Sequence, residues 1–101
     1  MIIYNVTVNV EKDIQEEWIK WMKEVHIPDM LNTGLFEGHK FLRLLNEEPE
    51  NTGVTYAVQC FCEDMKKLQL YMAQHAPALQ KEHTERYKDK FVAFRTLLEE
   101  V

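Results

Sequence analysis

The sequence predicts a single α+β domain, residues 1–101, whose elements follow the order β-α-β-β-α-β. Three observations predict it. In residues 2–10 the even-numbered side chains are apolar and most of the odd-numbered ones are polar. This period of two is typical of a strand. Apolar residues then recur at helical spacing in two later segments, 13–26 and 64–83. The chain has 101 residues, 46% hydrophobic and 29% charged, which suits one globular domain with its own core.

The pattern changes from that of a strand to that of a helix near Asp13. Even-numbered side chains of residues 2–10 are all apolar, so one side of this strand is expected to face a core. Asp13 and Glu16 have the spacing of a helix capping pair. The apolar positions that follow are Ile14, Trp18, Trp21 or Met22, and Val25.

We expect this helix to end near His26. Ile27 precedes a proline, and a residue in that position is pushed toward extended geometry. Pro28 is then expected to begin a short second helical turn, which Gly34 closes.

Two strands joined by a polar loop come next, at residues 35–45 and 54–62. The loop between them has the composition of a hairpin connection, and its acidic run, residues 47–50, is expected to be solvated.

Asp64 is expected to cap the second helix, and residues 91–98 are expected to form the last strand. Pro77 interrupts the helix and either kinks it or begins a second segment. Its apolar positions are Met65, Leu68, Met72, Ala76, Leu79 and His83. The complete order is that of the ferredoxin-like sandwich, in which both helices cover one face of the sheet.

The uncovered face of this sheet is the place where the sequence predicts a ligand. The helix-facing side takes the even-numbered residues of the first strand and Tyr56, Val58, Cys60 and Cys62. The opposite face takes Ile3, Asn5, Thr7, Asn9, Ala57, Gln59 and Phe61. That face is either plain solvated sheet or is closed by a second subunit into a barrel with a small polar cavity, and Phe61 favours closure. The facing of residues 35–45 stays open, because apolar residues occur in both of its registers.

The net charge of the chain and its cysteine content limit which binding partners and which cellular location are expected. A net charge of −5 argues against nucleic acid, whose phosphates require clustered lysine and arginine. The N-terminal residues lack the features of a secretory signal, and no apolar run approaches the roughly 18 residues of a membrane span. Cys60 and Cys62 stand two apart in a strand, too close for easy bridging. We expect a cytoplasmic protein without a membrane or nucleic-acid partner.

The stretch WIKWMKEVHIPDMLNTGLFEG, residues 18–38, carries a resemblance to the dimeric α/β-barrel superfamily. Within it, the chain resembles a bacterial family of small proteins known only as a domain of unknown function, over nearly its whole length. The resemblance implies a homodimer in which two sheets pack face to face, and it implies no established activity. We expect no cofactor.

The same superfamily includes cofactor-independent monooxygenases that oxidise polycyclic phenols, such as those of antibiotic biosynthesis, and heme-degrading monooxygenases. The heme-degrading members use an asparagine on strand one, a tryptophan ending strand three and a histidine on the second helix. The matching positions here are Asn5, Phe61 and His83. Phe61 replaces the tryptophan that helps to shape the distorted heme site, so heme degradation is the less expected alternative.

Candidate catalytic residues are His26, Asn5 and His83. His26 has two interpretations: an imidazole that bonds the free carbonyls at a helix end, or an acid or base titrating near neutrality. The first is favoured, because no nucleophile or carboxylate stands at motif spacing. His75 and His83 stand eight apart, unlike the four-residue spacing of helical metal pairs, so no metal site is expected.

Candidate ligand-binding residues are Asn5, Thr7, Asn9, Gln59 and Phe61. Neutral donors and acceptors in a half-closed cavity can orient a small hydrophobic or aromatic ligand. The alternative is that they bond water or each other across a dimer. The sequence therefore predicts a homodimeric small-molecule-binding barrel, with a cofactor-independent monooxygenase as the alternative, and leaves open whether it is an enzyme.

Overall fold

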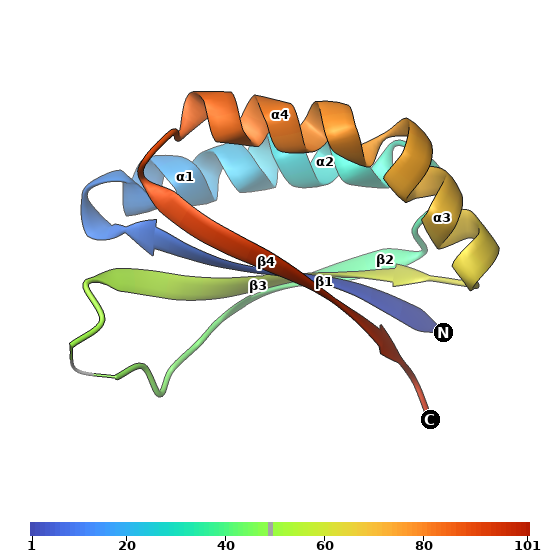
Figure 1. The fold of residues 1–101 in the computed structure, drawn as a ribbon, viewed down its shortest axis with the longest axis horizontal. Coiled ribbons are helices and arrows are strands. Elements are labelled where there is room, and N and C mark those ends of the chain that lie inside the picture. Colours follow the sequence, from blue (N-terminus) through green and yellow to red (C-terminus); the bar gives the residue numbers. More distant parts are fainter. Residues whose placement is uncertain (49) are drawn as a thin grey trace.

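The computed structural model describes residues 1–48 and 50–101 and places every helix on one side of a twisted antiparallel sheet (Figure 1). Its strands lie in the order β2-β3-β1-β4. They are β1 (Ile2–Glu11), β2 (Gly38–Arg43), β3 (Gly53–Cys62) and β4 (Phe91–Glu99). This order confirms the predicted ferredoxin-like sandwich. Pro49, part of the acidic run predicted to be solvated, lies outside the described residues.

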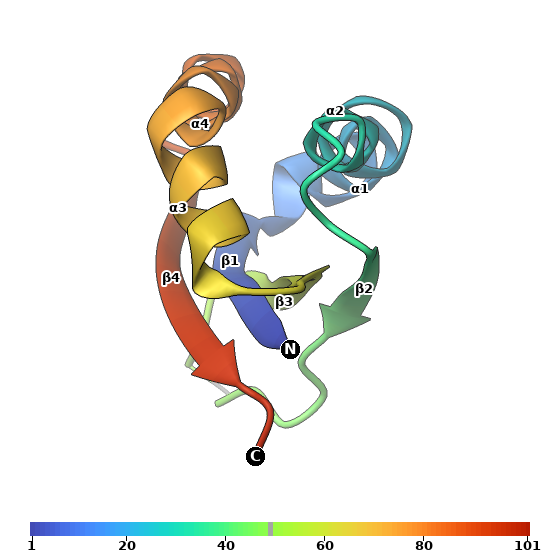
Figure 2. The same ribbon diagram turned by 90° about the vertical axis from the view of Figure 1, so that its right-hand side faces the viewer.

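The helices form two rods that run side by side over the same face of the sheet (Figure 2). The first rod is a short 3₁₀ turn η1 (Lys12–Ile14), α1 (Gln15–Trp21), a π turn η2 (Met22–His26) and α2 (Ile27–Leu31). The second is α3 (Met65–Gln74) followed by α4 (Ala76–Arg86). Pro77 stands in the first turn of α4, so it begins a second helical segment, one of the two predicted outcomes.

The core lies between this sheet face and the two rods. In β1 the even-numbered Ile2, Tyr4, Val8 and Val10 are buried, and β3 contributes Tyr56, Val58, Cys60 and Cys62, as predicted from the period of two. Trp18 is fully buried, with its ring centroid 5.6 Å from that of Phe41 and 5.1 Å from that of Tyr56. Aromatic contacts of this kind therefore hold the first rod on β2 and β3.

The predicted capping role of Asp13 is wrong, whereas that of Asp64 is confirmed. The side chain of Asp64 accepts a hydrogen bond from the Lys67 N–H at 2.9 Å and begins α3. Asp13 instead lies in η1 and pairs with the Lys90 ammonium at 2.9 Å. Lys90 also contacts Glu11 at 3.4 Å, so this lysine ties the end of β1 to the start of β4. Lys90 is far from Asp13 in the sequence, so the spacing of neighbouring residues does not predict this ion pair.

The predicted end of the first helix near His26 is also wrong. Ile27 has helical angles, φ −64° and ψ −45°, and its N–H bonds the carbonyl of Met22, five residues earlier. A proline in a regular helix clashes with the carbonyl four residues before it. The wider π turn relieves that clash ahead of Pro28, so the helix continues to Leu31. Gly34 closes the segment with φ 78°, as predicted.

Strand β2 is shorter than predicted, and its facing is now fixed. Residues 35–37 precede it without strand geometry. His39, Phe41 and Arg43 pair with helix-facing residues of β3, so they take the helix side. Lys40 and Leu42 take the other side.

The sheet face away from the helices has no cover within the described chain, and it carries both polar and large apolar side chains. Phe94 is 62% exposed and Val92 is 70% exposed, and both stand on this face beside Thr7 and Asn9 of β1. Further apolar members, all on this face, are Ile3, Leu42, Phe61 and Leu98. Several large apolar side chains exposed on one face indicate an interface.

Among the described helices, none is long and apolar enough to cross a membrane.

Candidate functional site

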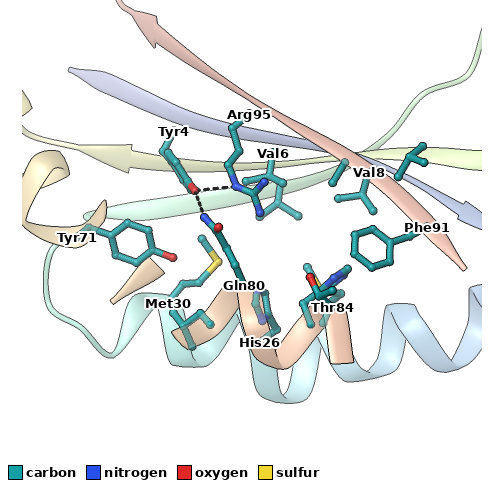
Figure 3. A pocket seen from close by; sticks show the side chains of 16 residues that line it. Tyr4, Val6, Val8, His26, Met30, Tyr71, Gln80, Thr84, Phe91 and Arg95 are labelled. Carbon is teal, nitrogen blue, oxygen red and sulfur yellow. Dashed lines mark hydrogen bonds between the residues drawn. The ribbon is translucent and has the colours of Figure 1, made fainter. Parts of the chain in front are cut away.

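A cavity of about 300 Å³ lies inside the sandwich, between the sheet and both helical rods (Figure 3). Strand β1 supplies its floor with Tyr4, Val6 and Val8. The other lining residues are Met22, His26 and Met30 of the first rod, Tyr71, Leu79, Gln80, His83 and Thr84 of the second, Val58 of β3, and Phe91, Val92, Ala93 and Arg95 of β4. Thr84, Val92 and Arg95 of this lining are exposed, so the cavity opens to solvent between α4 and β4.

Two histidines meet at one side of the cavity. The ring centroids of His26 and His83 are 5.6 Å apart, and the side chains are 9% and 7% exposed. The π turn ends at His26, so the same distortion that accommodates Pro28 places this ring at the cavity. The Trp18 Nε1–H donates to His83 Nε2 at 2.9 Å. Because that nitrogen accepts, a neutral His83 carries its proton on Nδ1.

Burial keeps both imidazoles uncharged at neutral pH. Desolvation lowers the pKa of His26 to about 4, an effect that the Asp29 carboxylate opposes and the Arg95 guanidinium reinforces. Desolvation likewise lowers the pKa of His83 to about 4, with smaller contributions from His26 and Arg95. His26 Nδ1 is buried without a hydrogen-bond partner, which is rare and costly in a protein core. The pair therefore consists of two neutral imidazoles in an apolar setting.

The free energy of unfolding should fall as the pH is lowered from about 6.5 toward 4. An unfolded histidine titrates near 6.5. Between that value and about 4 the unfolded chain binds protons that the folded rings do not. The contribution of the two neutral rings to the free energy of unfolding is therefore fully present above the pKa of an unfolded histidine. It is lost as the pH falls, by up to about 1.4 kcal/mol per pH unit for each ring.

Urea unfolding at a series of pH values measures this slope. His26→Gln should remove about half of it, whereas His39→Gln, a change at an exposed position, should leave it unchanged. A flat stability profile between pH 6.5 and 5 in the unmodified protein would contradict the buried neutral pair.

The opposite side of the cavity is polar and cationic. Arg95 is paired with Val6 across the β1–β4 ladder, so it stands on the helix-facing side of the sheet. Its Nε–H donates to the Tyr4 hydroxyl at 3.2 Å, and Gln80 Nε2 donates to the same oxygen at 3.5 Å (Figure 3). Tyr71, 2% exposed, points its hydroxyl toward the cavity from α3 (Figure 3).

A second hollow of about 210 Å³ adjoins this polar side. It shares Tyr4, Gln80 and Arg95 with the main cavity and lies over the junction of α3 and α4. Its remaining lining residues are Met72, Ala76, Pro77 and Leu97. The three shared residues thus form a boundary between the inner cavity and an outer hollow.

The structure brings together two of the three predicted catalytic candidates. His26 and His83 share the cavity, whereas Asn5 stands on the opposite face of the sheet and donates from its amide to the Thr7 hydroxyl at 3.1 Å.

The predicted ligand-binding residues lie together on the uncovered face, as the alternation along the strands predicted. Asn5 pairs with Gln59 and Ile3 pairs with Phe61 in the β1–β3 ladder, and none of the predicted set lines the cavity. Asn9 donates to the Thr55 hydroxyl at 2.9 Å. Any ligand contact by this set requires a second copy of the chain to enclose it.

The arrangement implied by heme-degrading relatives does not form. Asn5 and Phe61 lie on one face of the sheet and His83 lies on the other. The Nε2 of His83 already accepts the Trp18 indole N–H, so this lone pair is engaged. These residues do not fit a heme site. Within residues 1–48 and 50–101, no group of three or more histidine, cysteine or acidic side chains is placed to hold a metal ion.

The sequence interpretation missed the cationic side of the cavity. Strand β4 has a detectable signal: Phe91, Ala93 and Leu97 fall in the core-facing register, and Arg95 is a charge in that same register. Tyr4 is likewise a single phenol among the aliphatic residues of the core-facing side of β1. A polar group at an intended core position is a recognised indication of function.

Comparison with known proteins gives a family and a fold. The profile of the family described as "Domain of unknown function (DUF4286)" matches residues 1–101. No curated protein is similar enough in sequence to give a match.

Solved structures with this fold span several activities. A mutant of MhuD with two manganese protoporphyrin IX molecules per active site has a TM-score of 0.72 and 19% identity, over 100% of this chain and 95% of that chain. A dimeric ferredoxin-like protein from an uncultured marine organism has a TM-score of 0.72 and 13% identity, with 100% and 95% covered. An antibiotic biosynthesis monooxygenase has a TM-score of 0.62 and 11% identity, with 100% and 99% covered. These similarities establish the fold, and fold alone does not establish function.

Proposed function

We propose that this chain, which belongs to the DUF4286 family, is a homodimer in which each subunit binds a small organic ligand in the cavity between its sheet and its helices. The observation that carries the proposal is the cavity itself. About 300 Å³ lies open between the sheet and the helices, which is within the range of small-molecule sites. Ligand sites typically combine an apolar lining of this size with a few convergent polar groups.

The lining supplies both components. Val6, Leu79 and Phe91 give an apolar wall, while His26 and Tyr71 contribute polar atoms. His26 Nδ1 has no partner among the described residues. A buried polar atom without a hydrogen-bond partner destabilises the protein in the absence of a ligand. Its presence is consistent with a site in which a ligand supplies the missing hydrogen bond.

Ala93→Phe should abolish ligand binding without unfolding the protein. Ala93 is partly buried on the cavity floor, opposite Val8, so a phenyl ring there occupies the hollow. Filling a cavity commonly stabilises a domain by about 0.5–2 kcal/mol. The measurement is thermal shift and calorimetry with a panel of small aromatic and aliphatic amphiphiles, together with native mass spectrometry of ligand that co-purifies.

The matched control is Ala78→Phe on the exposed side of α4, which should bind as the unmodified protein does. If the panel and the co-purification both give no ligand, the proposal is wrong. If Ala93→Phe binds the same ligands with unchanged affinity, the cavity is not their site.

The homodimer is proposed from the apolar sheet face. Val92 and Phe94 are 70% and 62% exposed on this face, and a second copy turned sheet to sheet would cover them. The solved dimeric ferredoxin-like protein of the same fold agrees with this assembly. In such a dimer Asn5, Thr7, Asn9, Gln59 and Phe61 lie at or beside the contact between subunits.

An oxygenase without a cofactor is the second candidate, and the unpaired ring nitrogen of His26 favours it. In the described residues His26 Nδ1 has no partner, so it can accept a hydrogen bond from a phenol and increase the electron density of the ring that reacts with oxygen; its pKa of about 4 makes it too weak a base to remove the proton outright. Oxygen consumption recorded during the same ligand screen distinguishes the two functions. Binding without oxygen uptake supports a binding protein, and uptake lost in Ala93→Phe supports the enzyme.

A cytoplasmic location is proposed from the thiols. Cys60 and Cys62 are both free and buried, and burial raises the pKa of Cys60 to about 12, so this thiol is inert. Free cysteines are typical of a reducing compartment.

A further inference from the structure

Among the described residues, no acidic side chain pairs with the Arg95 guanidinium at the boundary between the two hollows. His26 and His83 are neutral, so Arg95 is the single charged group among the described residues that line either hollow. None of the ion pairs within the described chain includes Arg95.

The guanidinium is held in place and keeps its outer edge free. Its Nε–H is bonded to the Tyr4 hydroxyl at 3.2 Å, and Gln80 approaches the same hydroxyl from α4. No hydrogen bond in residues 1–48 and 50–101 uses either Nη nitrogen. The two Nη groups present the planar fork that binds a carboxylate through two parallel hydrogen bonds.

The space beside this fork is apolar. The main cavity continues from Arg95 along Val6, Val8 and Phe91 toward the two neutral histidines. No aspartate or glutamate lines either hollow in the described part of the chain, so nothing repels an anion there. A ligand that satisfies both features has one negative group at an end of an apolar body.

We propose that the cavity takes an organic carboxylate with a small apolar body, and that the Arg95 guanidinium binds its carboxylate; this inference rests on the proposed ligand-binding function. The carboxylate lies at the boundary with the outer hollow, where Arg95 is exposed to solvent. The apolar body extends inward between the sheet and the rods. Tyr4 acts as a positioning residue that orients the guanidinium.

The test compares carboxylates with their neutral carboxamides. The probes are 2-naphthoate, cinnamate and octanoate, each against its primary amide, with dissociation constants measured by calorimetry. Hydrogen bonds to a charged group contribute roughly 10- to 100-fold in affinity, so each acid should bind that much more tightly than its amide. Arg95→Gln should remove this preference by weakening the acids while the amides bind as before. Arg95→Lys keeps the charge without the fork, so it should give an intermediate preference.

The control is Arg43→Gln, which removes an arginine of the same sheet that lines neither hollow and should leave the preference unchanged. If acids and amides bind equally, and Ala93→Phe abolishes the binding of both, the carboxylate inference is overturned while the ligand-binding function stands. If Arg95→Gln keeps the preference for acids, another group binds the anion and the assignment of Arg95 is wrong. If neither class binds, both proposals are contradicted.

Discussion

Phe94→Glu should convert the proposed homodimer into monomers, with a dissociation constant at least about a thousandfold higher. Phe94 is 62% exposed beside Thr7 on the uncovered face, where two sheets would meet. Glutamate there places a desolvated carboxylate against an apolar surface. A two-fold interface contains the substitution twice, so an effect of about 4 kcal/mol or more is expected.

Sedimentation over a range of concentrations measures the change in mass and in affinity. Phe61→Glu, on the same face across β3, should shift the equilibrium in the same direction. Leu70→Glu is the matched control, because Leu70 is 41% exposed on α3, which covers the other face. A monomer in the unmodified protein at micromolar concentration would refute the sheet-to-sheet assembly. A dimer that survives both substitutions on this face would place the interface elsewhere.

Trp18→Ala should cost about 3–5 kcal/mol of unfolding free energy. The indole is fully buried between α1, β2 and β3, so its removal leaves a large void and separates the first rod from the sheet. A domain of this size has a total stability of only about 5–15 kcal/mol. Urea unfolding should therefore show either a much lower midpoint or a partly unfolded protein.

A double-mutant cycle separates the hydrogen bond from the packing. Trp18→Phe keeps an aromatic ring but leaves the buried Nε2 of His83 without its donor, at a cost of about 1–3 kcal/mol. His83→Phe leaves the indole N–H unpaired in the same way. Because the double substitution removes both polar partners, it should cost less than the sum of the two single changes. Strictly additive losses would show that the Trp18–His83 bond contributes nothing to stability.

Much of the architecture was predictable because burial imposes regular periods. The alternation in residues 2–10 and 54–62 gave the facing of the two central strands, since side chains of a strand point alternately to its two faces. Asp64 was a correct cap because its partner, the Lys67 N–H, is three residues away. Asp13 failed as a cap because its actual partner, Lys90, is 77 positions away.

The first rod shows a different limit. The rule for residues before proline predicts extended geometry at Ile27, yet contacts of the buried Met22, Ile27 and Met30 with the core keep the segment helical. The chain resolves the conflict with a π turn rather than a break. Packing free energy outweighed a local preference, and the result directs His26 into the interior.

The sequence by itself determined the order of the elements and the side of each central strand that faces the helices, and it named His26 and His83 as candidates before their place in the fold was known. Only the tertiary structure decided that a cavity exists there and that Arg95 meets Tyr4, 91 positions away, and Gln80 beside it. The physical reason is the distance along the sequence over which each pattern acts. Periods of 2 and 3.6 residues reflect which side of a single strand or helix is buried. The binding site instead forms where β1, α4 and β4 come together, and that depends on how all of the elements pack.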